Sequence, residues 1–170
     1  SAGNFRYTLY AQDAYGGYSG SLSYPLTVVA GQSYHLSGIF ISPTLYSDSQ
    51  EVKRGDNINF YGYGAQNSTV ILEIKSKATG AIINYQTLAN ISGNYSYVLS
   101  TLGLDEGTYE IKAKSKIGAD ESPFSYTLDF VVGIKTIEKP KPDSRCPQKG
   151  DVNGDCRVNL VDFSITAYWY

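Results

Sequence analysis

A short stretch near the carboxyl end, GDVNGDCRVNLVDF at 150–163, concentrates the residues best suited to chemistry. Carboxylate and amide side chains recur there at alternate positions and are followed by an apolar segment. Three carboxylates within one short loop repel one another, and a hard divalent cation relieves that repulsion. The sequence therefore predicts a cation site in this loop. The alternative is a solvated turn, because Asp, Asn and Gly are common turn formers.

The spacing of these residues is that of an EF-hand calcium loop, which supplies oxygen ligands from positions 1, 3, 5, 7, 9 and 12. Counted from the first aspartate, the predicted Ca²⁺ ligands are Asp151, Asn153, Asp155, Arg157 through its backbone carbonyl, Asn159 and Asp162. A helix beginning near Leu160 is expected to carry Asp162 back towards the ion. Asp162 stands where the pattern usually has the longer Glu, so the predicted loop is tighter.

Cys156 occupies loop position 6, where a glycine is expected because the backbone there usually has a positive φ. We expect a Cys146–Cys156 disulfide to hold the loop and offset that strain. In the chain-entropy model, closing so short a ring stabilises the fold by about 2–3 kcal/mol. An even number of cysteines also favours an oxidising, extracellular compartment. Two free thiols are the alternative.

The segment GDVNGDCRVNLVDFSITAYW at 150–169 resembles one repeat of a type I dockerin. The resemblance implies the same calcium ligands, a cohesin-like protein partner and attachment of polysaccharide-degrading enzymes to a scaffold. Family members hold two such repeats, whereas this chain shows a single one. Leu160 and Val161 stand where the family often carries small hydroxyl residues. We expect these two apolar side chains either to form a docking face or to pack on a second repeat.

Alternating apolar segments fill most of the chain before residue 134 and predict half-buried strands. Turn signals such as RGDN at 54–57 and DEG at 105–107 separate these segments. The predicted fold class is all-β, a two-sheet sandwich followed by the short EF-hand-like loop and helix. The closing segment at 107–133 also resembles bacterial immunoglobulin-like domains of surface and secreted proteins. The residues expected to share strand faces are Phe5, Tyr7, Leu9, Ile58, Phe60, Val70, Leu72, Ile74, Tyr95, Tyr97, Leu99, Tyr109, Ile111, Ala113, Tyr126, Leu128, Phe130 and Val132.

An internal repeat sets the expected domain boundaries. Residues 5–31 match residues 109–133, with an offset of 104 from Phe5 to Tyr109 and 102 from Leu26 to Leu128. Such a period corresponds to one sandwich domain. We therefore expect the last strands of a preceding immunoglobulin-like repeat at 1–31, a sandwich at 35–133, a Pro-rich linker at 134–149 and the dockerin-like repeat at 150–170. The alternative is a single domain that begins with an extra hairpin.

Composition and charge argue against several classes of function. The net charge is −2, from 14 basic and 16 acidic residues without a like-charged block, which argues against nucleic acid as a partner. No apolar run is long enough to span a bilayer. The one histidine, His35, lacks an assembled acid or base around it, so we expect no enzyme activity in this chain and place any hydrolase activity in upstream domains.

The expected function is a non-catalytic, extracellular or cell-surface part: immunoglobulin-like spacers that carry a calcium-loaded docking module. The alternative is a carbohydrate-binding or adhesion sandwich attached to an upstream hydrolase. Tyrosine is abundant, with 16 residues, and its rings can stack on sugars. Tyr61 and Tyr63, which alternate with Ile58 and Phe60, are the pair most expected to point outward for that purpose.

Overall fold

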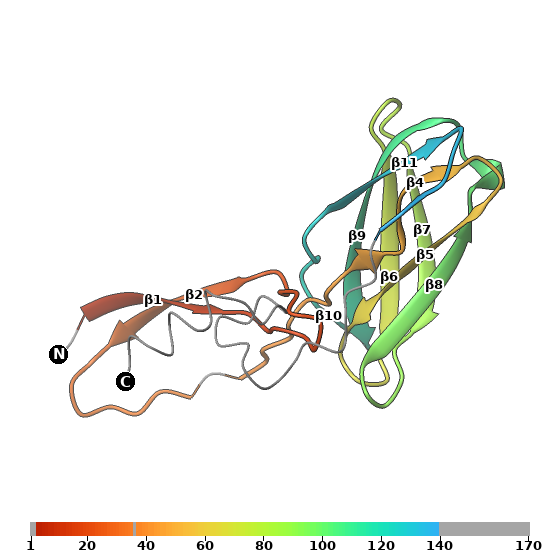
Figure 1. Ribbon diagram of the computed structural model, residues 1–170. Coiled ribbons are helices and arrows are strands. Elements are labelled where there is room, and N and C mark those ends of the chain that lie inside the picture. The colour runs from red at the N-terminus through yellow and green to blue at the C-terminus, as the bar shows by residue number, and fades with distance from the viewer. Residues whose placement is uncertain (1–2, 36, 140–170) are drawn as a thin grey trace, which may run out of the picture. The chain divides into compact units, whose positions relative to one another are not determined.

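The computed structural model describes residues 3–35 and 37–139, and over these residues the fold is all-β, as predicted. The predicted calcium loop and helix at 150–170 lie outside the described residues. Figure 1 shows the strands in chain order from red to blue. Their bounds are β1 (Gly3–Leu9), β2 (Leu22–Val28), β3 (Tyr46–Ser47), β4 (Ser49–Lys53), β5 (Asn57–Tyr63), β6 (Thr69–Ser76), β7 (Ile82–Leu88), β8 (Asn94–Ser100), β9 (Gly107–Ile117), β10 (Asp120–Glu121), β11 (Leu128–Gly133) and β12 (Ile137–Glu138), with one 3₁₀ turn η1 (Thr101–Gly103).

Strands β3 to β12 form two sheets that pack face to face. One sheet has the order β3-β5-β8, and the other has the order β12-β4-β11-β9-β6-β7 with β10 paired to β9. Strands β3, β5 and β8 take the places of A, B and E in an immunoglobulin-like sandwich, while β11, β9, β6 and β7 take those of G, F, C and C′. Strand β4 pairs in parallel with β11, and the other pairings are antiparallel.

The core lies between the two sheets and follows from the period-two alternation of the strands. In β5, Ile58 and Phe60 are fully buried, and Phe60 meets Phe130 of the opposite sheet with ring centroids 5.2 Å apart. Full burial of each such side chain stabilises the fold by about 1.5–3 kcal/mol. The buried apolar residues are Val52, Ile58, Phe60, Val70, Leu72, Ile74, Ala89, Tyr95, Leu99, Leu104, Tyr109, Ile111, Ala113, Phe130 and Val132. The predicted faces are thus confirmed in the sandwich, except that Tyr126 precedes β11 and is exposed.

The chain enters and leaves the sandwich at the same end. After β11 it turns back, and β12 runs antiparallel to β4, so that two residues of the expected linker add a short strand to the sheet. The amide of Lys139 donates to the carbonyl of Asp48 at 2.7 Å, and its Nζ donates to Ser47 Oγ at 2.8 Å. Burial lowers the pKa of the Lys139 amine, and the Asp48 carboxylate partly offsets this. Lys139 therefore lies beside the first strands of the sandwich.

Strands β1 and β2 form a separate antiparallel hairpin, paired from Gly3 with Val28 to Leu9 with Leu22. A serine bridges the hairpin beyond these strands. The amide of Ala11 donates to Ser19 Oγ at 2.8 Å, and Ser19 Oγ donates to the carbonyl of Gly20 at 3.1 Å. The amide of Ser19 returns a bond to the carbonyl of Ala11 at 2.9 Å.

The sandwich contains the same arrangement at the end of β9. The amide of Ser115 donates to Ser122 Oγ at 2.9 Å, Ser122 Oγ donates to the carbonyl of Pro123 at 2.8 Å, and the amide of Ser122 donates to the carbonyl of Ser115 at 2.8 Å. Ala113 and Ser125 repeat it once more. The hairpin and the β9–β11 region therefore share a local hydrogen-bonding pattern. Their strand registers correspond at an offset of 104 on both strands, because Leu26 pairs with Phe5 as Phe130 pairs with Tyr109, whereas the sequence match gave 102 for the second strand.

The hairpin differs from β9 in burial. Phe5 and Tyr7 are 50% and 44% exposed, although the matching residues Tyr109 and Ile111 are in the core of the sandwich. The alternation of β1 is preserved, but no second sheet covers this face in the described residues. The hairpin therefore presents a two-stranded sheet with an apolar side, an arrangement that is marginal in water without further contacts.

Candidate functional site at the tyrosine-rich junction

All site residues predicted from the sequence lie in the part of the chain that the structure leaves undescribed. They are the ligand set Asp151, Asn153, Asp155, Arg157, Asn159 and Asp162, the cysteines Cys146 and Cys156, and the docking pair Leu160 and Val161. Within residues 3–35 and 37–139, no group of three or more His, Cys, Asp and Glu side chains gathers where it could hold a metal ion. In the same ranges no helix is long and apolar enough to cross a bilayer.

The described residues place their most connected polar group in the turn of the first hairpin. The Oδ1 atom of Asp13 accepts hydrogen bonds from the amides of Tyr15 at 2.9 Å and Gly17 at 3.0 Å. The amide of Asp13 donates to the carbonyl of Gly17 at 2.9 Å, and the amide of Gly16 donates to the carbonyl of Asp13 at 3.0 Å. Aspartate favours such turns because its carboxylate reaches the amides that follow it. The sequence DAYGG therefore builds this turn locally.

The same carboxylate reaches the sandwich. Tyr46, at the start of β3, donates its phenolic hydrogen to Asp13 at 3.0 Å from Oδ1 and 2.8 Å from Oδ2. A Cβ atom on Gly17 would overlap the Tyr46 hydroxyl, so the close approach requires glycine at that position. Hydrogen bonds to a charged group contribute about 1.5–3 kcal/mol, more than neutral ones. We call this contact the Asp13–Tyr46 latch.

Three tyrosines of the sandwich surround Tyr15 of the turn. Its ring centroid lies 5.9 Å from that of Tyr46, 6.4 Å from Tyr61 and 5.6 Å from Tyr63. Tyr46 and Tyr61 stack with centroids 5.6 Å apart. Aromatic pairs of this kind contribute about 0.5–1.5 kcal/mol each beyond area burial. Tyr61 and Tyr63 do face away from the core as predicted, but Tyr15 packs on them, so they are not the open sugar-stacking pair that the sequence suggested.

The electrostatics of the junction keep its tyrosines neutral. Burial, followed by the hydrogen bond and negative charge of Asp13, raises the pKa of Tyr46 well above its usual value. Burial and the neighbouring Tyr15 also raise the pKa of Tyr61 and Tyr63. All three hydroxyls are therefore protonated at neutral pH; that of Tyr46 donates to Asp13, while the rings of Tyr61 and Tyr63 pack on Tyr15. The arrangement joins two parts of the chain and offers no group tuned for acid or base catalysis.

A cleft of about 430 Å³ lies next to the latch. Its walls come from the hairpin, from the connecting segment 39–44 and from residues 63–65 at the end of β5. Of the described residues along it, Asp13 is the one with an acidic or basic side chain, and Tyr46 and two backbone amides already engage that carboxylate. The described walls of the cleft are therefore suited to packing or to binding an uncharged group.

Sequence reasoning missed the junction residues. Asp13 and Tyr15 belong to a turn signature, DAYGG, that identifies a tight turn but gives no information about what the turn contacts. Nothing in the sequence around Tyr46 distinguishes it from the other tyrosines of the strands. Asp13 and Tyr46 are 33 residues apart in the sequence, and the period-two alternation within a strand gives no information about a contact over that distance.

Comparison with known proteins places the chain among no established family. No family model matches the chain, and no curated protein matches it. Among solved structures, chitinase ChiW from Paenibacillus sp. str. FPU-7, titled a bacterial cell-surface-expressed multi-modular enzyme machinery, is 19% identical over 61% of this chain and 9% of that chain, with a TM-score of 0.40. The D00-D0 domain of intimin is 18% identical over 75% of this chain and 64% of that chain, with a TM-score of 0.38. The chain thus spans less than two thirds of either structure.

Proposed function

We propose that the chain is a non-catalytic module of an extracellular or cell-surface multidomain protein. In this proposal an immunoglobulin-like sandwich is held against a preceding unit of the same kind, and a calcium-loaded dockerin-like repeat follows it. The repeated serine bridge carries the first half of the proposal. Ala11 with Ser19 and Ser115 with Ser122 form the same backbone and Oγ hydrogen bonds, which supports the interpretation of the first hairpin as an F–G strand pair.

The apolar side of the hairpin supports the same idea. Phe5 and Tyr7 pair across to Leu26 and Tyr24, and together they form a face that matches the buried face of β9 and β11. Covering that face with the remaining strands of a preceding unit would give these side chains the environment that Tyr109 and Ile111 have. The Asp13–Tyr46 latch would then connect two successive sandwiches.

Hydrogen exchange tests this half of the proposal. We expect the β1 and β2 amides to exchange much faster than those of β9 in this chain, and to become protected when about 70 preceding residues are added. The estimate follows from the size of a sandwich domain of about 100 residues. A hairpin that remains equally unprotected in the longer protein would contradict the proposal. The β9 amides serve as the internal reference in both samples.

The second half of the proposal depends on the donor set of residues 151–162. Five side chains and one carbonyl supply the hard oxygens that Ca²⁺ prefers, in the EF-hand spacing. The partner proposed for the loaded repeat is a cohesin-like protein, and the biological setting proposed for it is polysaccharide degradation. Binding of the full chain to an immobilised cohesin panel, with Ca²⁺ and with EGTA, tests the partner. Calcium binding without binding to any cohesin would refute the proposed partner but not the proposed calcium site.

A further inference from the structure

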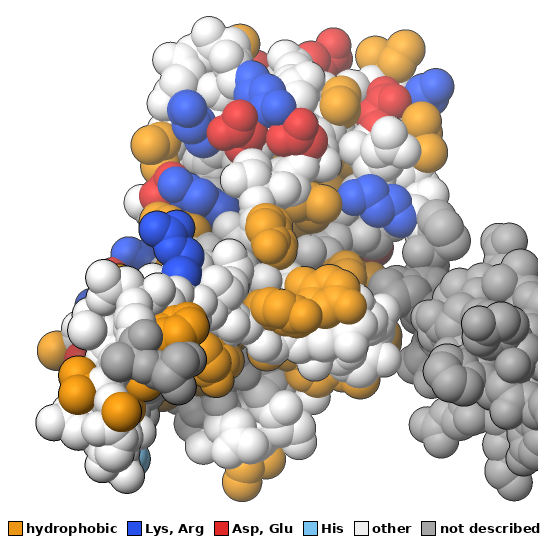
Figure 2. Space-filling model, turned by 90° about the vertical axis from the view of Figure 1, so that its left-hand side faces the viewer, with side chains coloured by type: hydrophobic (Ala, Val, Ile, Leu, Met, Phe, Trp, Pro, Cys, Tyr) orange, Lys and Arg blue, Asp and Glu red, His pale blue; other side chains and the backbone are white. Residues whose placement is uncertain are grey.

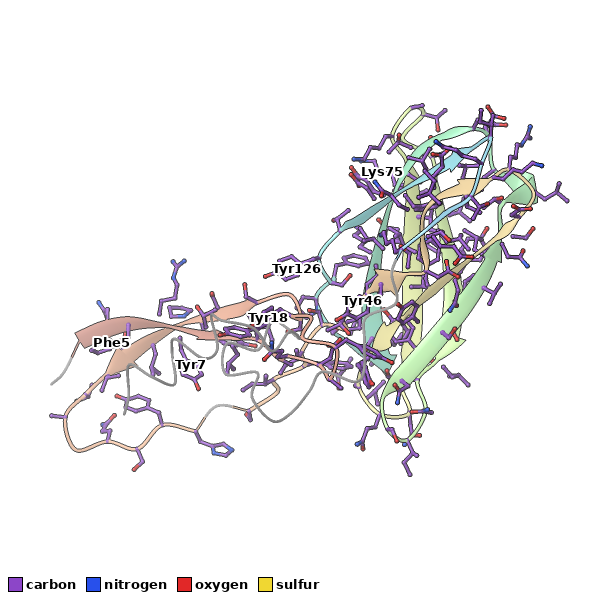
Figure 3. The ribbon with its side chains drawn as sticks, in the orientation of Figure 1. Phe5, Tyr7, Tyr18, Tyr46, Lys75 and Tyr126 are labelled. Atoms are coloured by element: carbon purple, nitrogen blue, oxygen red, sulfur yellow. The ribbon has the colours of Figure 1, made fainter. Side chains whose placement is uncertain are left out.

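A second group of tyrosines lies outside the junction and remains open to solvent. Tyr10 and Tyr18 of the hairpin meet edge to face, with ring centroids 5.3 Å apart. Tyr126 of the sandwich lies near Tyr18 in Figure 3. Tyr10, Tyr18 and Tyr126 line an open hollow of about 260 Å³. Their exposed fractions are 59%, 51% and 61%. We call these three residues the tyrosine trio.

The serine bridges of the sandwich show which residues stand at the matching positions there. Tyr10 and Tyr18 immediately precede Ala11 and Ser19, the two residues of the bridge in the hairpin. The residues that precede Ser115 and Ser122 in the sandwich are Lys114 and Glu121, which form an ion pair at 2.5 Å. In the sandwich, one copy of the bridge therefore carries this ion pair, and the Ala113–Ser125 copy carries Lys112 over the ring of Phe124. The hairpin carries two tyrosines at the matching positions. Two large aromatic rings at solvent-facing positions are the feature that requires an explanation.

Completion of a preceding unit would leave these rings exposed. The apolar side of β1 consists of the alternate residues Phe5, Tyr7 and Leu9, while Arg6 and Thr8 lie on its other side. Tyr10 continues the series of Arg6 and Thr8 by the period of two. Strands that cover Phe5 and Tyr7 would therefore pack on the side opposite to Tyr10. Burial by the remainder of a sandwich does not account for the trio.

We propose that the tyrosine trio binds neutral saccharide rings of a polysaccharide. Each phenol ring offers an apolar surface for the C–H face of a sugar ring and a hydroxyl that can hydrogen-bond to sugar hydroxyls. Among the described residues, no charged side chain lines the hollow, which disfavours an anionic or cationic ligand. The hollow is open and shallow, so it suits flat rings of an extended chain better than the protruding side chain of a protein partner. On the face that Figure 2 shows, hydrophobic side chains lie scattered among Lys, Arg, Asp and Glu in the upper part and gather in larger groups lower down.

Native affinity electrophoresis tests the proposal with the full chain. Gels contain hydroxyethyl cellulose, glycol chitin, xyloglucan, arabinoxylan or galactomannan, with alginate and polygalacturonate as anionic controls. We expect slower migration in at least one neutral polymer, unchanged by added salt because no ion pair is involved. The gels contain EGTA, so a failure of the calcium proposal does not affect this result.

Variants assign the binding to the trio. We expect Tyr10→Ala combined with Tyr18→Ala, and Tyr126→Ala alone, to weaken the retardation about tenfold or more, because each removes a stacking surface. Tyr18→Phe keeps the ring and should stay within about threefold of the parent. Tyr34→Ala is the matched control, since Tyr34 is also exposed but does not line the hollow. Thermal unfolding of every variant checks that the fold is retained.

Three outcomes in the neutral polymers would overturn the proposal. They are the absence of retardation in every neutral polymer, equal retardation of the parent and the alanine variants, and an effect of Tyr18→Phe as large as that of the alanine variants. Retardation that occurs in the anionic polymers and disappears with salt would also overturn it, because that behaviour indicates binding of charge.

Discussion

The carboxylate of Asp13 accepts the phenolic hydrogen of Tyr46 with both of its oxygens, at 3.0 Å and 2.8 Å, while Oδ1 also closes the turn around Tyr15 and Gly17. One side chain therefore shapes the hairpin turn and attaches that turn to the sandwich. Local folding of the turn and its docking on the sandwich are coupled through this group, since the geometry that suits the amides also directs Oδ2 towards Tyr46.

Removing the Tyr46 hydroxyl should release the turn from the sandwich. We expect Tyr46→Phe to weaken docking by about 1.5–3 kcal/mol, because the Asp13 charge loses its one donor from the sandwich. Hydrogen exchange of the Ser19 amide, which bonds to the carbonyl of Ala11, should accelerate by about 10- to 150-fold. Tyr61→Phe removes a hydroxyl from the neighbouring ring, to which the structure assigns no hydrogen bond, and should leave the exchange rate unchanged. Equal exchange in both variants would contradict the role of the latch.

Gly62 should tolerate no side chain, although its strand looks ordinary. A Cβ atom there would overlap the carbonyl oxygen of Thr44 and lie 2.8 Å from its carbon and 3.0 Å from the Tyr95 hydroxyl. We expect Gly62→Ala to lower the free energy of unfolding by about 1–3 kcal/mol, as overpacking does. Gly103→Ala meets open space and should stay within about 0.5 kcal/mol. Urea denaturation measures the free energy of unfolding of both variants. Equal urea midpoints for Gly62→Ala and Gly103→Ala would refute the crowding at Gly62.

Alkaline pH should destabilise the sandwich through its buried tyrosine. Burial raises the pKa of Tyr95, whose hydroxyl donates to the carbonyl of Thr44 at 2.5 Å. The unfolded chain releases this proton near pH 10, while the folded chain keeps it. The stabilisation is therefore complete below about pH 10 and is lost as the pH rises towards the folded-state pKa, with a slope of about 1.4 kcal/mol per pH unit for one such group.

Urea midpoints between pH 8 and pH 11 measure this slope. We expect Tyr95→Phe to flatten the decline, since the variant lacks the titrating group. Val70→Ala is the control, because it removes buried apolar contacts and should lower stability by a similar amount at every pH. A decline of the same steepness in Tyr95→Phe and the parent would show that other groups cause it.

The carboxyl-terminal loop should bind one Ca²⁺ per chain. We expect calorimetric titration of the full chain to give a single site, and Asp151→Ala combined with Asp155→Ala to abolish the heat, because two of the charged ligands are then absent. Glu106→Ala, which changes an exposed carboxylate of the sandwich, should bind like the parent. The absence of heat from the unaltered chain would refute the site.

The strands and their inward faces follow from local pattern, whereas the contacts between distant segments do not. The alternation of Ile58 with Phe60, and of Tyr109 with Ile111, predicts their burial because one face of a half-buried strand repeats every second residue. The same alternation places Tyr61 and Tyr63 on the other face but gives no information about Tyr15 covering them. The alternation in YTLDFVV predicts that Tyr126 shares the apolar face of β11, but Ser125 bonds to Ala113 ahead of that strand, and Tyr126 is exposed.

The return of β12 along β4 has a mechanical consequence. Tension applied to the chain on either side of the sandwich would act on two points at one end of it, near Ser47 and Lys139. Such a load would act first on the short β12–β4 ladder and on β3, the strand that contains Ser47. Under flow or traction, the end of the sandwich that contains Ser47 and Lys139 would therefore bear the load first, and the opposite end would bear it last.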